Sequence, residues 1–140
     1  MRKTSFVLTT ALLISLGFSY LWSASEAEEV AVSSARFWLS LIDYGRYSSS
    51  WQKASAYFRG AVTEKSWTAS MEGFRKPLGK LVSRELVKVQ ESSSLPGAPD
   101  GKYMVMSFKT VFEQKKSAVE TATFALDKDQ KWRAAGYFIR

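Results

Sequence analysis

Hydrophobic and polar positions along the chain change their period near residue 80. Before it, apolar side chains recur at helical spacing over residues 28–43, 51–58 and 63–79. After it, apolar and polar side chains alternate as in strands over residues 80–90, 103–112, 119–126 and 131–140. Helices followed by antiparallel strands predict an α+β domain, with three N-terminal helices packed on a curved four-stranded antiparallel sheet.

The alternation is clearest in the strand expected over residues 103–112. One face of this strand is expected to join the core, and it carries Met104, Met106, Phe108, Thr110 and Phe112. The opposite face carries Tyr103, Val105 and Val111, which form a half-apolar patch. Patches of this kind favour contact with a partner, so we expect a homodimer through the sheet face.

An uncharged stretch over residues 6–22 follows Arg2 and Lys3 and precedes small and acidic residues. This order is typical of a secretory signal peptide. We therefore expect residues 1–27 to be a helical signal peptide that is removed before Glu28. The remainder, residues 28–140, would then be a single α+β domain in the periplasm or outside the cell. The alternative is an uncleaved membrane anchor. A spanning helix needs about 20 apolar residues, and the uncharged stretch over residues 6–22 is close to that length.

The chain has no histidine and no cysteine. Their absence removes the commonest transition-metal ligands, thiol catalysis and histidine-based triads, so we expect no metal and no cofactor. The net charge is +7, but the basic residues are scattered singly or in pairs. That distribution is more typical of a solvated surface than of a nucleic-acid site, and we expect no nucleic-acid partner.

Two carboxylates are the candidate catalytic groups of a cofactor-independent isomerase, dehydratase or hydrolase. Asp43 lies at the end of the first predicted helix beside Tyr44 and Tyr47, and Glu120 shares a strand face with apolar residues. A buried carboxylate is costly unless it is paired, and Arg84 in the first strand is its expected partner. An ion-paired acid stays ionised and is a poor acid catalyst, so pairing of both acids would exclude this role.

Several short motifs occur in a characteristic order from about residue 30 to the C-terminus. They are Trp38-Leu39, Asp43, Gly45, Tyr47, Ser50-Trp51, Trp67, Pro77-Leu78-Gly79, Ser83-Arg84, residues 95–103, residues 108–112, Glu120-Thr121 and residues 132–137. In these motifs the chain resembles the bacterial family catalogued as domain of unknown function 4019. The resemblance implies an exported bacterial protein whose cone-shaped fold is similar to nuclear transport factor 2, ketosteroid isomerase and cystatin-like domains. It implies no activity, because the fold alone does not supply one.

Cones of this kind often enclose a cavity between the sheet and the helices. The residues expected to line it are Trp38, Tyr47, Arg84, Met106, Phe108, Glu120 and Tyr137. We therefore expect a non-enzymatic module that binds a small apolar ligand or another protein. The alternatives are the carboxylate-dependent enzyme and a protein attached to the envelope surface by an uncleaved N-terminal helix.

Overall fold

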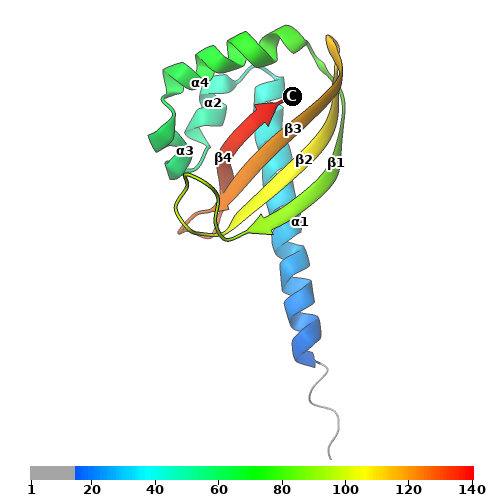
Figure 1. Ribbon diagram of the computed structural model, residues 1–140, viewed down its shortest axis with the longest axis vertical. Coiled ribbons are helices and arrows are strands. Elements are labelled where there is room, and N and C mark those ends of the chain that lie inside the picture. The colour runs from blue at the N-terminus through cyan, green and yellow to red at the C-terminus, as the bar shows by residue number, and fades with distance from the viewer. Residues whose placement is uncertain (1–14) are drawn as a thin grey trace, which may run out of the picture.

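The computed structural model describes residues 15–140, with side chains from residue 26 onward. Its helices are α1 (Ser15–Asp43), α2 (Tyr47–Gln52), α3 (Ala56–Ala61) and α4 (Glu64–Ser70), followed by a π-helical turn η1 (Met71–Arg75) and a 3-10 turn η2 (Lys76–Leu78). Its strands are β1 (Leu81–Ser92), β2 (Tyr103–Phe112), β3 (Lys115–Leu126) and β4 (Trp132–Ile139). The strands form one antiparallel sheet in the order β1-β2-β3-β4 (Figure 1), so the predicted α+β class and four-stranded sheet are confirmed.

The helix predicted over residues 51–58 is in fact two helices, α2 and α3. The break lies at Ser55, whose backbone N–H donates to the Ala134 carbonyl in β4 at 2.8 Å. The Ser55 hydroxyl then caps α3 by accepting from the Phe58 N–H at 3.1 Å. A capping serine that also bonds the sheet ends one helix and starts the next, which helical periodicity alone does not reveal.

Helix α1 runs unbroken past Glu28, the position of the expected cut. Figure 1 shows it crossing behind the sheet, with its N-terminal part projecting beyond the domain. Its buried side chains begin at Ala31 and include Ala35, Trp38, Leu39, Leu41 and Ile42. Residues 1–14 of the expected signal peptide lie outside the described residues. Among the helices of residues 15–140, none is long and apolar enough to cross a membrane.

The core lies between one face of the sheet and the helices. The five residues predicted to face it from β2 are all at most 2% exposed, which confirms that prediction. Three of them, Met104, Met106 and Phe108, belong to one core cluster with α1, α2 and α4 residues, among them Trp38, Leu39, Tyr47 and Trp67.

In Figure 1 the other face of the sheet, turned to the viewer, carries no helix of the described residues. Val105 and Val111 are half-buried on it. Tyr103 adds little surface to this patch because it is only 4% exposed, with its hydroxyl donating to the Pro99 carbonyl and its ring against Gly101.

Candidate functional site

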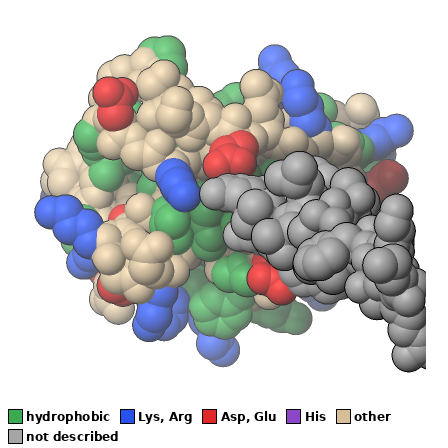
Figure 2. All heavy atoms as spheres, turned by 90° about the horizontal axis from the view of Figure 1, so that it is seen from below, with side chains coloured by type: hydrophobic (Ala, Val, Ile, Leu, Met, Phe, Trp, Pro, Cys, Tyr) green, Lys and Arg blue, Asp and Glu red, His purple; other side chains and the backbone are tan. Residues whose placement is uncertain are grey.

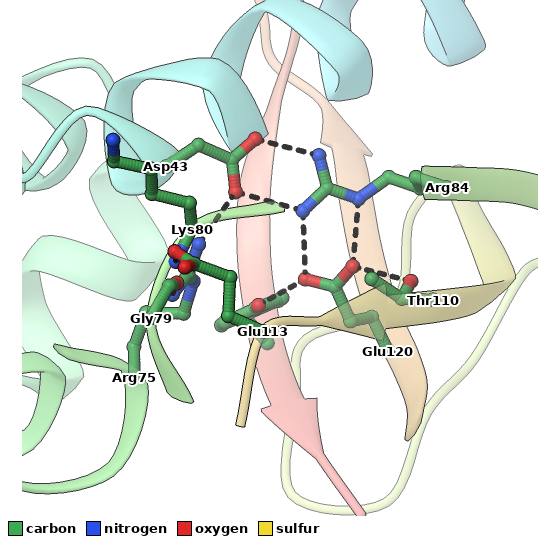
Figure 3. Close-up of polar contacts among 9 residues, drawn as sticks. Asp43, Arg75, Gly79, Lys80, Arg84, Thr110, Glu113 and Glu120 are labelled. Atoms are coloured by element: carbon green, nitrogen blue, oxygen red, sulfur yellow. Dashed lines mark hydrogen bonds and ion pairs between the residues drawn. The ribbon is translucent and has the colours of Figure 1, made fainter. Parts of the chain in front are cut away.

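Arg84 lies between two carboxylates at the centre of a buried ion network (Figure 3). Its Nε donates to Glu120 Oε1 at 2.6 Å, and its Nη1 donates to Asp43 Oδ2 at 2.7 Å. Nη2 reaches both acids, at 2.9 Å from Asp43 Oδ1 and 3.1 Å from Glu120 Oε2. The Glu120 side chain is fully buried, and those of Arg84 and Asp43 are 8% and 11% exposed. The planar guanidinium therefore joins the end of α1 to strand β3 through β1.

Arg75 adds a second buried cation to this network. Its Nη2 donates to Asp43 Oδ1 at 3.2 Å and its Nη1 to the Gly79 carbonyl at 2.6 Å. The guanidinium stacks on Phe112, 4.3 Å from the ring centroid. The π-helical turn η1 inserts an extra residue into the helix, and Arg75 closes it on the core side. Arg75 Nε is buried and has no hydrogen-bond partner among the described residues.

The Glu120 carboxylate is satisfied from several sides. Thr110 Oγ1 donates to its Oε1 at 2.6 Å, and the Tyr137 hydroxyl donates to its Oε2. Burial first, and then the negative charge of Glu120, raise the pKa of Tyr137 well above its ordinary value. Burial tends to lower the pKa of Arg84, but its hydrogen bonds and ion pairs with Asp43 and Glu120 outweigh this and raise it. The network is therefore closed, with each carboxylate hydrogen-bonded to a guanidinium.

Both candidate catalytic acids thus lie in ion pairs. The Glu120–Arg84 pair expected from the sequence is confirmed. Asp43, the candidate base beside Tyr44 and Tyr47, shares Arg84 with Glu120 and also binds Arg75. An acid paired in this way is a poor acid catalyst.

Sequence reasoning missed Arg75 as a member of the site. A signal for it was present, because Arg75 lies four positions after Met71 and eight after Trp67, on the same buried helix face. A charged residue at a core position of an apolar stripe indicates a buried partner elsewhere in the fold.

The interior expected to hold a ligand is filled by its own lining residues. Met106 and Phe108 are fully buried in the core, and Arg84 and Glu120 bind each other. Trp38 packs against Trp67 and Tyr137, with ring centroids 5.8 and 5.6 Å apart, and its Nε1 donates to the Ser50 carbonyl at 2.8 Å. Of the seven expected pocket residues, Tyr47 and Tyr137 border larger surface hollows.

The larger hollow is an apolar groove of about 520 Å³ between β4 and the helical segment from α3 to η1. Its lining residues are Tyr57, Phe58, Ala61, Val62, Trp67, Ser70, Met71, Phe74 and the strand residues 135–139. We call this hollow the β4 groove. None of these lining residues carries a charge, and Phe74 and Phe138 are 75% and 52% exposed. Exposed aromatic side chains around a concave uncharged surface are typical of a binding site.

A second hollow of about 460 Å³ lies at the mouth of the ion network. Asp43 and Arg75 border it from inside, and Glu72, Lys80 and Glu113 from outside. Glu113 Oε1 accepts from the Lys80 backbone N–H at 2.7 Å, and Asp43 and Arg75 bind each other. Lys76 also borders it, so its charged groups are of both signs. Three of them, Asp43, Arg75 and Glu113, are already hydrogen-bonded within the chain.

The molecular surface carries its charges in a dispersed pattern. Figure 2, which views the end from which α1 projects, shows lysine and arginine side chains spread singly, with acidic and apolar side chains between them. Among the described residues, no three acidic side chains come together in a way that could hold a metal ion.

These observations define a class: a small α+β protein with a closed ion network and an open apolar groove. The chain belongs to the family described as protein of unknown function (DUF4019), whose sequence model matches residues 34–137. The family resemblance expected from the motifs is therefore confirmed. No curated protein and no solved structure matches the chain.

Proposed function

We propose that this chain is a non-enzymatic binding module whose ligand is an apolar molecule or protein segment held in the β4 groove. The observation that carries the proposal is the lining of that groove, which is uncharged and includes Phe74 at 75% exposure. Covering such aromatic surface releases about 25 cal/mol for each square ångström of apolar area removed from water. A groove of about 520 Å³ is large enough for a small apolar ligand or a few side chains.

The state of the carboxylates supports binding over catalysis. A general acid or base needs a carboxylate that exchanges a proton with its substrate. Glu120 is fully buried against Arg84, Thr110 and Tyr137, and Asp43 is held by two arginines. The groove itself contains no charged side chain to replace them.

We further infer that the protein is exported by a bacterium and that residues 28–140 form a single cone-shaped domain of the nuclear transport factor 2 type. Helices gathered on one face of a four-stranded antiparallel sheet support the cone. The charged head, apolar stretch and small residues at the N-terminus support export. Retention of the N-terminal helix as an anchor is the alternative, and the unbroken course of α1 through Glu28 is compatible with it.

The test of groove binding uses N-phenyl-1-naphthylamine, an uncharged probe whose fluorescence rises in apolar surroundings. We expect saturable binding that is about tenfold weaker in the variant Phe74→Ala, because the groove loses an aromatic wall. Phe37→Ala is the matched control, since Phe37 is also an exposed phenylalanine on a helix but does not border the groove. Absence of binding, or equal loss in both variants, would overturn the proposal.

A homodimer through the open sheet face is a second candidate. Val105 and Val111 lie half-buried on that face, and no helix of residues 15–140 covers it. Light scattering at micromolar concentration should then report a dimer that Val105→Lys dissociates. A monomer at that concentration excludes pairing through the sheet face.

A further inference from the structure

Strand β4 lies at one edge of the sheet and has β3 as its only strand neighbour in the described chain. Val119 and Arg140 exchange both backbone hydrogen bonds, at 2.9 and 3.0 Å. In an antiparallel ladder, bonded and non-bonded pairs alternate. Counted from that bonded pair, Glu120 with Ile139 and Ala122 with Tyr137 are therefore non-bonded pairs. The pair between them, Thr121 with Phe138, is a bonded one. The N–H and C=O groups of Tyr137 and Ile139 consequently point away from β3, toward the free edge.

The β4 groove follows this edge. The side chains of residues 137–139 alternate between the two faces of the sheet, yet all three line the groove, together with Ala135 and Gly136. A hollow that touches consecutive residues of a strand runs along its backbone. The opposite wall is mostly helical and includes Phe58 from α3, Trp67 from α4, and Met71 and Phe74 from η1.

The groove has one closed end. The Ala134 carbonyl accepts from the Ser55 N–H at 2.8 Å, which occupies the edge where α3 begins. The pairing of β3 with β4 is irregular between Thr123 and Phe124, and this leaves Ala135 without a strand partner. The accessible edge therefore covers residues 135–139, about 16 Å of extended chain.

We propose that the β4 groove binds an extended apolar peptide segment, which adds to the sheet as a fifth strand beside β4. This proposal rests on the proposed function and names its ligand. Backbone hydrogen bonds to Tyr137 and Ile139 supply affinity for any extended chain, and the aromatic wall selects apolar side chains at alternate positions.

Charged side chains near the groove indicate which residues should flank the apolar centre of the peptide. Helix α3 and strand β4 contain no acidic residue, whereas Arg59 near the end of α3 and Arg140 after β4 are exposed. Arg133, the one charged residue within β4, is already bound by Asp127 and Asp129. A peptide with acidic residues flanking its apolar centre complements this surface, and the net charge of +7 acts in the same direction.

A second copy of the chain fits the edge less well than a peptide. The helical wall from α3 to η1 stands beside β4, so the edge opens into a groove instead of a flat sheet margin. A second copy pairing there through its own β4 would bring its own helical wall to the same place. A free segment brings no such obstacle.

The test measures binding of fluorescent peptides to the full chain by anisotropy. The probe has five alternating valine and alanine residues between aspartate pairs, and its partner is the same peptide N-methylated at alternate positions. We expect N-methylation to weaken binding about tenfold or more, because it removes the donors that pair with β4. Lysine flanks in place of aspartate should weaken binding several-fold at low salt.

Protein variants locate the contact. Ile139→Pro removes one outward N–H and is a substitution that edge strands tolerate. Val87→Pro is the control, because Val87 lies exposed at an irregularity of the other edge strand, β1. We expect peptide binding to be lost in the first variant and kept in the second. The N-methylated peptide tests the same hydrogen bonds without altering the protein, so the proposal stays open to refutation even where a variant fails to fold.

The outcomes separate this proposal from the proposed function. Equal binding of both peptides, with the naphthylamine probe also bound, overturns strand addition and leaves apolar binding standing. Failure of the peptides and the probe together overturns both. A dimer that Ile139→Pro dissociates assigns the edge to a second copy and overturns the peptide as occupant.

Discussion

Asp43 and Glu120, from opposite parts of the chain, bind two edges of one guanidinium. Arg84 Nη1 lies 2.7 Å from Asp43 and Arg84 Nε lies 2.6 Å from Glu120. The arrangement ties the C-terminal end of α1 to the middle of β3 through a side chain of β1. Buried charges are costly in isolation, so each of the three groups depends on the other two.

Arg84→Met should strongly destabilise the fold. The substitution leaves Glu120 buried without a guanidinium, a change that typically costs about 3–5 kcal/mol. Urea unfolding followed by tryptophan fluorescence measures the change in the free energy of unfolding. The control is Arg46→Met, an exposed arginine, for which we expect a change within about 0.5 kcal/mol.

A double-mutant cycle tests whether Arg84 and Glu120 act as a unit. Glu120→Gln should be less damaging in the Arg84→Met background than alone, with a coupling energy of about 0.5–3 kcal/mol. Simple addition of the two effects would show that the contact in the structure contributes little.

Ser50→Ala should also destabilise the protein, though less. The Ser50 hydroxyl donates to the Tyr47 carbonyl at 2.6 Å and accepts from Trp67 Nε1 at 2.9 Å. Loss of this hydroxyl leaves a buried indole N–H without an acceptor, which should lower the free energy of unfolding by about 1–3 kcal/mol. Thermal unfolding compares it with Ser49→Ala, whose side chain makes no described hydrogen bond. Equal melting temperatures for the two variants would contradict the assignment.

The environment of Tyr137 should make the folded state less stable at alkaline pH. Burial and the neighbouring Glu120 raise the pKa of Tyr137 well above 10.0, so the folded state binds the phenolic proton more tightly than the unfolded state. Its contribution is complete below about pH 10 and is lost as the pH rises toward the folded-state value. Denaturant midpoints between pH 8 and 11 should therefore fall less steeply for Tyr137→Phe than for the unaltered chain. Parallel curves would be evidence against this environment.

Removal of residues 1–27 should leave the domain folded. The fully buried positions of α1 begin at Ala31, and residue 27 is only partly buried against the core. A chain of residues 28–140 should keep its circular dichroism spectrum, whereas a chain starting at residue 36 loses Ala31 and Ala35 and should unfold. Mass spectrometry of the exported protein should place its N-terminus at Glu28; a chain that keeps residues 1–27 would indicate an anchor.

Asp129 should titrate in strongly acidic solution. Its hydrogen bonds with Arg133, the first of them at 2.8 Å, lower the pKa of Asp129 from 3.8 to about 2. The stabilisation from this pair is present above about pH 4 and is lost as the pH falls through 2. A carbon-detected NMR titration should find this value and, in Arg133→Gln, a higher pKa, because the largest lowering cause is removed. An unchanged titration in the variant would exclude Arg133 as the cause.

Local patterns were sufficient to place the core-facing side chains of the strands. The alternation in β2 placed Met106 and Phe108 in the core, and the face of Glu120 in β3 called for a cation that Arg84 supplies. The family was equally evident, because its motifs are runs of sequence read in order. The alternation of a strand and the cost of burying a charge depend on the residues nearby in the sequence. Both can therefore be predicted without knowledge of the fold.

Only the tertiary structure decided which distant segments of the chain lie side by side. The break between α2 and α3 depends on a bond from Ser55 to β4, and Arg75 finds its partner Asp43 at the end of α1, 32 positions earlier in the chain. The filled interior and the open β4 groove result from the way the helices pack on the sheet. The hydrophobic periodicity of the sequence does not predict that packing. The sequence by itself determined the helix-then-strand order and the inward carboxylate, since both follow from local spacing and charge. The partners of that carboxylate and the free edge of β4 arise from contacts between distant segments, whose geometry is set when the whole core packs at once.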